Sequence, residues 1–117
     1  MTTPRESQHI QSPLVRLRDD VLLCPLCGEE NLHHQGVRVY ERDNEDAERG
    51  RVVTVARQVT VSREEMDGNP SSRRDGLKIV FCCEHCVNSF ELRLSQHKGS
   101  TYLSWWYADP QDEGGVR

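Results

Sequence analysis

The sequence of 117 residues lacks any long hydrophobic run. Hydrophobic residues make up only 35% of it, below the share usual for a soluble domain. No apolar stretch approaches the roughly 18 to 20 residues of a membrane-spanning helix, and the N-terminus lacks the apolar centre of a signal peptide. We therefore expect a small cytoplasmic domain with a modest core and a highly polar surface.

The chain also lacks the motifs of common enzyme classes. It has no serine or cysteine nucleophile paired with a histidine at a recognisable spacing, no phosphate-binding glycine loop and no His-x-Glu signature. The net charge of −4 argues against non-specific coating of nucleic acid, because such binding comes mainly from phosphate neutralisation. A local basic patch stays compatible with that charge. We expect a protein that is not an enzyme.

Five cysteines are present, an odd number, and four of them form two Cys-x-x-Cys pairs: Cys24 with Cys27, and Cys83 with Cys86. Close pairs are typical of a metal site in a reducing compartment, whereas a disulfide framework would spread its cysteines differently. Each pair bends the backbone into a knuckle, and two knuckles supply the four thiolates of one closed, structural Zn²⁺ site. The 55 residues between the pairs exceed the usual 15 to 20, and we assign the excess to an inserted hairpin.

Neighbouring residues leave alternatives to this ligand set. Cys82 would point to the opposite strand face from Cys83, so we interpret it as a bystander thiol. His85 lies inside the second knuckle and is an alternative to a thiolate. His33 and His34 either hydrogen-bond a zinc sulfur or face solvent, and the second interpretation is favoured. A redox pair is disfavoured because a strand-helix context is missing.

Alternating side chains predict strands over residues 32–42, 51–62, 77–81, 90–95 and 102–107, with a tight turn at Lys98-Gly99. The first two would form a long hairpin between the knuckles. The predicted fold is mostly β: a zinc ribbon with an antiparallel sheet of about five strands. We expect a flexible arm over residues 1–18, the ribbon domain over 19–108 and a flexible tail over 109–117.

Two polar loops, 71–76 and 96–101, are the predicted binding surface, because loops on a rigid scaffold usually carry binding. Lys78 and Arg93 lie on the polar sides of adjacent strands and would extend that surface, unless this is an ordinary solvated face. The predicted contacts to a partner or nucleic acid are Arg73, Arg74, Lys78, Arg93, His97 and Lys98. In Trp105-Trp106-Tyr107, at least one ring should pack on the core, leaving another for the surface.

Several segments together resemble a family of small zinc-ribbon proteins found in actinobacteria, bacteriophages and prophages. They are Cys24 to Gly28, Leu32 to His34, Val37 to Arg42, Asn69 to Leu77, Cys83 to Cys86 and Gln96 to Trp105. The resemblance covers about residues 22–105. It implies zinc ligands at Cys24, Cys27, Cys83 and Cys86, not at Cys82, and a phage or bacterial setting. It implies no biochemical activity.

These features favour a non-enzymatic binding module that acts on a host or phage protein, as an adaptor or an inhibitor. An alternative is direct binding of nucleic acid through the basic loop and sheet face. A thiol-dependent or metal-dependent enzyme is a third hypothesis, and it is disfavoured because four thiolates leave zinc no open position.

Overall fold

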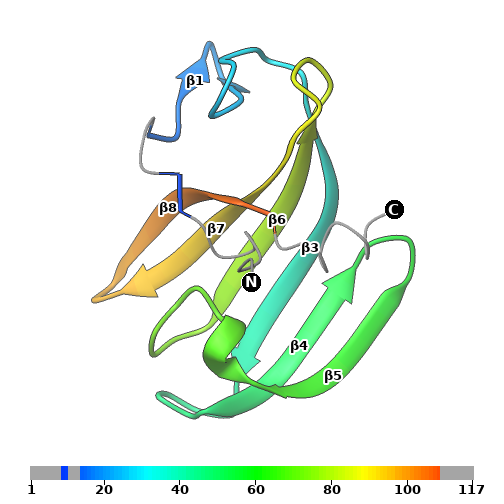
Figure 1. Cartoon of the computed structure of the whole chain (residues 1–117). Helices are drawn as coiled ribbons and strands as arrows, with labels where there is room; N and C mark the ends of the chain where they lie inside the picture. Colours follow the sequence, from blue (N-terminus) through cyan, green and yellow to red (C-terminus); the bar gives the residue numbers. More distant parts are fainter. Residues whose placement is uncertain (1–8, 11–13, 109–117) are drawn as a thin grey trace, which may run out of the picture.

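Alternating apolar and polar residues build a six-stranded antiparallel sheet in the computed structural model, which describes residues 9–10 and 14–108 (Figure 1). The strand order is β5-β4-β3-β6-β7-β8. The strands are β3 (Leu32–Arg42), β4 (Arg49–Val55), β5 (Val59–Glu65), β6 (Gly76–Cys83), β7 (Ser89–His97) and β8 (Ser100–Tyr107). Two short strands, β1 (Leu17–Arg18) and β2 (Val21–Leu22), form a separate ribbon before the first knuckle. The mostly β ribbon prediction is confirmed.

The segment 51–62 is not one strand, and this prediction is wrong. β4 and β5 form a hairpin of their own, with the turn at residues 56–58 and Val55 opposite Val59. Partners in this hairpin are both odd-numbered or both even-numbered, so the alternation of valines passes through the turn undisturbed. The sheet therefore gains a strand, and β5 becomes its outer edge. Met66–Gly68 (η1), a single 3-10 turn, follows β5.

The larger core lies near the cysteines. Trp105 and Phe90 are fully buried, with ring centroids 6.1 Å apart in an edge-on contact. Phe81 of β6 also packs edge-on against Trp105, with the two ring centroids 5.7 Å apart. The backbone N–H of Ile10 donates to the carbonyl of Trp105 at 2.9 Å, so Ile10 joins this cluster. A second, smaller core consists of Tyr40, Val52 and Met66.

The central strands run from the cysteines to the polar loops. Leu32 of β3 lies opposite Cys83 of β6 at one end. At the other end, Gly76 of β6 lies between Tyr40 and Ser95. Eight residues of β6 span about 23 Å at roughly 3.3 Å per residue. The cysteines and the polar loops therefore occupy opposite ends of the sheet.

The predicted N-terminal arm contributes to the structure where it is described. His9 forms a bridge with Trp106 on β8, and Leu17 pairs with Leu22. Residues 1–8 and 11–13 of that arm, and the predicted tail 109–117, lie outside the described residues. Within the described ranges, no helix is long and apolar enough to cross a membrane.

Candidate functional site

The two Cys-x-x-Cys segments adopt the same backbone turn. In the first, the Cys24 N–H donates to Glu29 and the Gly28 N–H donates to Cys24. The second segment repeats both bonds: the Cys83 N–H donates to the carbonyl of Asn88, five residues later, and the Val87 N–H donates to the carbonyl of Cys83, four residues earlier. The residue after each pair has a positive φ, 78° at Gly28 and 56° at Val87. The knuckles predicted from the spacing are therefore equivalent in structure.

The four sulfur atoms lie within 4.8 Å of one another. Two separations between the knuckles are 3.7 Å for Cys24 to Cys86 and 3.6 Å for Cys27 to Cys83. A tetrahedral ion with bonds of about 2.3 Å to sulfur would set its ligands about 3.8 Å apart. The four cysteines thus fit one metal ion and form a candidate metal centre.

Burial shapes the chemistry of this centre. Cys24 and Cys83 are fully buried, whereas Cys27 and Cys86 are half-buried. Burial raises the pKa of the Cys24 thiol to about 12, opposed by the backbone N–H groups of Cys27 and Leu26. A divalent ion favours the thiolate, so its binding would release protons and couple to folding. With four sulfur ligands, no position would be left for substrate.

The remaining candidates around the knuckles stand outside the sulfur cluster. The Cys82 sulfur lies 3.9 Å from the carbonyl of Cys83 and is not part of the cluster. The His33 ring pairs with the Glu84 carboxylate, and His34 is exposed. His85 is exposed within its knuckle and takes no part in the cluster.

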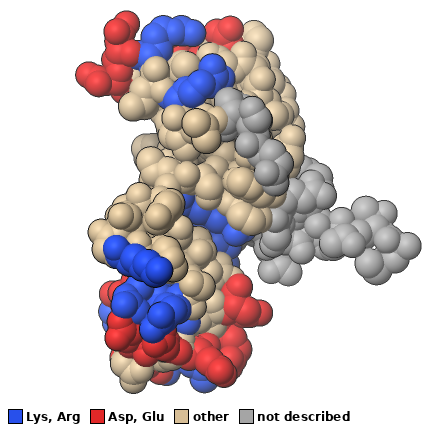
Figure 2. Space-filling view, turned by 90° about the vertical axis from the view of Figure 1, so that its left-hand side faces the viewer, with Lys and Arg blue, Asp and Glu red and all other residues tan. Residues whose placement is uncertain are grey.

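The two predicted binding loops meet at the other end of the sheet. A hollow of about 450 Å³ lies between the segment after β3, the loop before β6 and the β7–β8 hairpin. Its lining residues are Arg42, Asn44, Glu45, Arg73, Arg74, Asp75, Gln96, His97, Lys98 and Gly99. We call this the loop hollow. Figure 2 shows basic and acidic side chains intermixed at this lower end of the molecule, so the surface carries both signs.

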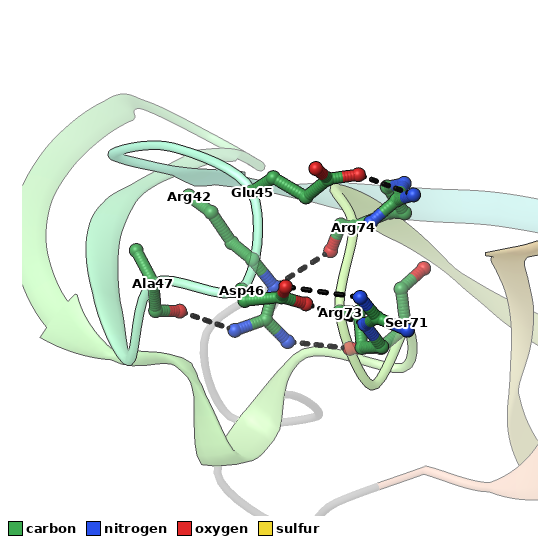
Figure 3. Close-up of polar contacts among 7 residues, drawn as sticks. All are labelled: Arg42, Glu45, Asp46, Ala47, Ser71, Arg73 and Arg74. Atoms are coloured by element: carbon green, nitrogen blue, oxygen red, sulfur yellow. Dashed lines mark hydrogen bonds and ion pairs between the residues drawn. The ribbon is translucent and has the colours of Figure 1, made fainter.

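Arg42 ties two walls of the loop hollow together (Figure 3). Its guanidinium donates to three backbone carbonyls: Ala47 at 2.5 Å, Ser71 at 2.7 Å and Arg74 at 2.9 Å. Its backbone N–H donates to the Asp75 carboxylate at 2.9 Å. One half-buried side chain at the end of β3 therefore fixes both neighbouring loops.

Arg73 and Arg74 extend from one loop to acids of the other (Figure 3). Arg73 binds both oxygens of Asp46, at 2.5 and 3.1 Å, and Arg74 pairs with Glu45. The Arg73 hydrogen bond holds the pKa of Asp46 below its ordinary value near 3.8. This pair therefore adds stability above that pH and loses it as the pH falls through the lowered pKa. Both arginines are exposed but already have partners.

The β7–β8 hairpin supplies the third wall. His97 and Ser100 are paired, and the turn between them has φ values of 50° at Lys98 and 83° at Gly99. The tight turn predicted at Lys98-Gly99 is confirmed. Lys98 is exposed and has no ion-pair partner among the residues that the structure describes.

Lys78 does not extend this surface, contrary to the sequence expectation. It is only 6% exposed and lies 3.7 Å from Glu91, which is fully buried. Arg93 donates to the same carboxylate at 2.5 Å and stacks on Trp106 at 3.8 Å from the ring centroid. A buried carboxylate needs such partners, so Lys78 and Arg93 form an internal ion cluster with Glu91.

The consecutive tryptophans divide as expected for a strand. Trp105 is buried, while Trp106 is half-buried, contacts the His9 ring and donates to Ser104 at 2.9 Å. The buried Trp105 indole N–H has no hydrogen-bond partner among described atoms.

Sequence reasoning missed Arg42, Asp46 and Glu91. The pairing of Asp46 with Arg73 joins residues 27 positions apart, and no local pattern indicates it.

No protein-family model, curated protein or solved structure matches this chain.

Proposed function

We propose that the chain is a zinc-stabilised binding module that is not an enzyme, and that it recognises another protein at the loop hollow. The fit of four sulfur ligands to one tetrahedral ion supports a structural Zn²⁺. The resemblance to zinc-ribbon proteins of phages and actinobacteria, and an adaptor or inhibitor role in a bacterial cell, stay predictions.

The observation that supports this function most is the meeting of both predicted loops around one hollow. Its volume is about 450 Å³, and Arg42 fixes two of its walls. Pairs such as Arg73–Asp46 present both charge signs on its rim. A protein surface of mixed charge complements such a rim better than a nucleic acid backbone does.

Nucleic acid is the second candidate, and one observation favours it. Tyr102 is 54% exposed, and its ring lies 6.3 Å from that of His97. A second hollow lined by both rings adjoins the loop hollow at Gln96 and His97. Unpaired bases stack on such rings, and Lys98 would contact phosphate.

The metal is tested first, by elemental analysis and X-ray absorption of the purified protein. We expect about one zinc per chain with four sulfur neighbours, and loss of the cooperative unfolding transition when a chelator removes it. Full stability without any metal would contradict the proposal.

Partner binding is tested by affinity capture from a lysate of the cells that express the chain. We expect a specific protein to be retained by the wild type and lost with Lys98→Glu. Arg16→Glu is the matched control, because Arg16 is also exposed, lies outside the loop hollow and outside β5, and undergoes the same charge change. If Lys98→Glu instead abolishes a salt-dependent shift of labelled DNA or RNA, the nucleic acid candidate replaces the protein one. Equal effects of both variants would argue against the loop hollow.

A further inference from the structure

Strand β5 is an edge of the sheet that no other described strand covers. It lies at one end of the strand order (Figure 1), and all seven of its residues are exposed. The opposite edge, β8, is partly covered by the chain itself, through the His9 bridge to Trp106. β5 contains no proline, and its register with β4 is continuous, so it carries no bulge. Proline and bulges are devices that commonly protect edges, and charged side chains are another, which β5 carries only at its Arg63-Glu64-Glu65 end.

The free backbone groups of β5 belong to its odd-numbered residues. At the two ends of the β4–β5 hairpin, the backbone N–H of Met66 donates to the carbonyl of Glu48, and the backbone N–H of Ala56 donates to the carbonyl of Gln58. The even-numbered partners therefore form the hydrogen-bonded pairs of this hairpin. Antiparallel pairs alternate between bonded and non-bonded. The N–H and C=O groups of Val59, Val61 and Arg63 therefore point outward, where they can pair with another strand.

An unusual number of valines lines one face at this edge. Val39, Val53 and Val61 are successive cross-strand partners, and Val37, Val55 and Val59 form the row beside them. Val59 is 64% exposed and Val61 is 62% exposed. Apolar side chains this open on an edge strand mark an interaction surface.

We propose that β5 pairs antiparallel with β5 of a second copy of this chain, around a two-fold axis at Val61. In this register Val61 faces Val61 of the second copy, and the valine row runs unbroken across both sheets. Val59 faces Arg63, and Arg57 faces Glu65 of the other copy. Arg57 has no ion-pair partner within the described ranges. Glu65 already pairs with Arg49 of its own chain, so in this register Arg57 of the other copy joins an existing ion pair at two symmetric places. The dimer is independent of the loop hollow.

The test is sedimentation velocity of the zinc-loaded chain in a reducing, disulfide-free buffer, from about 1 to 200 µM. We expect a reversible shift to twice the monomer mass. Val61→Lys places two lysines face to face and should weaken association at least about tenfold. Thr60→Lys is the matched control: it adds the same charge on the opposite face and should change association less than about twofold.

Val61→Pro removes one outward N–H that the monomer does not use, and should also give a monomer. If Val61→Pro also proves less stable in urea unfolding, the sedimentation of Val61→Lys decides whether β5 forms the dimer. Arg57→Glu should weaken association about two- to tenfold through the lost pairs. A monomer at every concentration would overturn the proposal, as would equal association of the wild type and Val61→Lys, or a partner other than a second copy on this edge.

Discussion

Replacing Arg42 by alanine should destabilise the domain by about 3 kcal/mol. Its guanidinium donates to the carbonyls of Ala47, Ser71 and Arg74, at distances of 2.5 to 2.9 Å. A hydrogen bond from a charged donor contributes about 1.5 to 3 kcal/mol, and we take about 1 kcal/mol for each because the side chain is only half-buried. For a domain of this size, the loss lowers the Tm by roughly 12 to 24 °C.

The assay is urea unfolding at saturating zinc, followed by tryptophan fluorescence, since buried Trp105 reports on the core. Arg42→Lys can satisfy one carbonyl and should lose about 2 kcal/mol. Arg57→Ala is the control, because Arg57 is exposed and outside the loop hollow, and should change stability by less than about 0.5 kcal/mol. If Arg42→Ala and Arg57→Ala are equally stable, Arg42 does not hold the loops together.

Three further predictions concern the knuckles and the ion cluster. Val87→Gly should stabilise by about 1 kcal/mol in urea unfolding, because Val87 has φ 56°, whereas Gly28→Val at φ 78° should destabilise by at least as much. A loss of stability in Val87→Gly, or a gain in Gly28→Val, would contradict the equivalence of the knuckles. Glu91→Gln leaves the charges of Lys78 and Arg93 uncompensated and should lower the free energy of unfolding by about 3 kcal/mol. Adding Lys78→Met should recover part of that loss. An unchanged free energy of unfolding in Glu91→Gln would show that the buried carboxylate charge is dispensable. Cys82→Ser should keep about one zinc per chain by elemental analysis, and a fall toward zero would make Cys82 a ligand.

Short-range patterns predicted the parts of this protein that depend on short-range chemistry. The spacing of Cys24 and Cys27 fixes a turn within five residues, and the same turn recurs at Cys83. The alternation that separates Trp105 from Trp106 follows from the pleat of a strand, whatever its neighbours are. Lys98-Gly99 carries its own turn signal.

The features that the sequence did not predict depend on which residues lie opposite on neighbouring strands. Val55 and Val59 are four residues apart, so a turn between them leaves the alternation intact and two strands resemble one. Lys78 sits on a polar row of its strand, which predicts solvent exposure. Only the tertiary structure places Glu91 beside it and the Tyr40 ring 5.4 Å from its ammonium group. Sequence periodicity cannot tell a solvated polar row from a buried ion cluster.

The separation of the two ends of the sheet makes an asymmetric prediction. β6 begins at Gly76, where an added Cβ would approach the Asn69 side chain to 2.2 Å, and ends at Cys83 in the sulfur cluster. Loss of the metal should unfold the domain on which the loops are built, so Cys83→Ser should abolish both zinc and partner binding. Lys98→Glu lies at the far end and should keep zinc at about one per chain while losing the partner. If Lys98→Glu also lost zinc, the two ends would not be separable, and the metal could not be treated as a support for a distant binding surface.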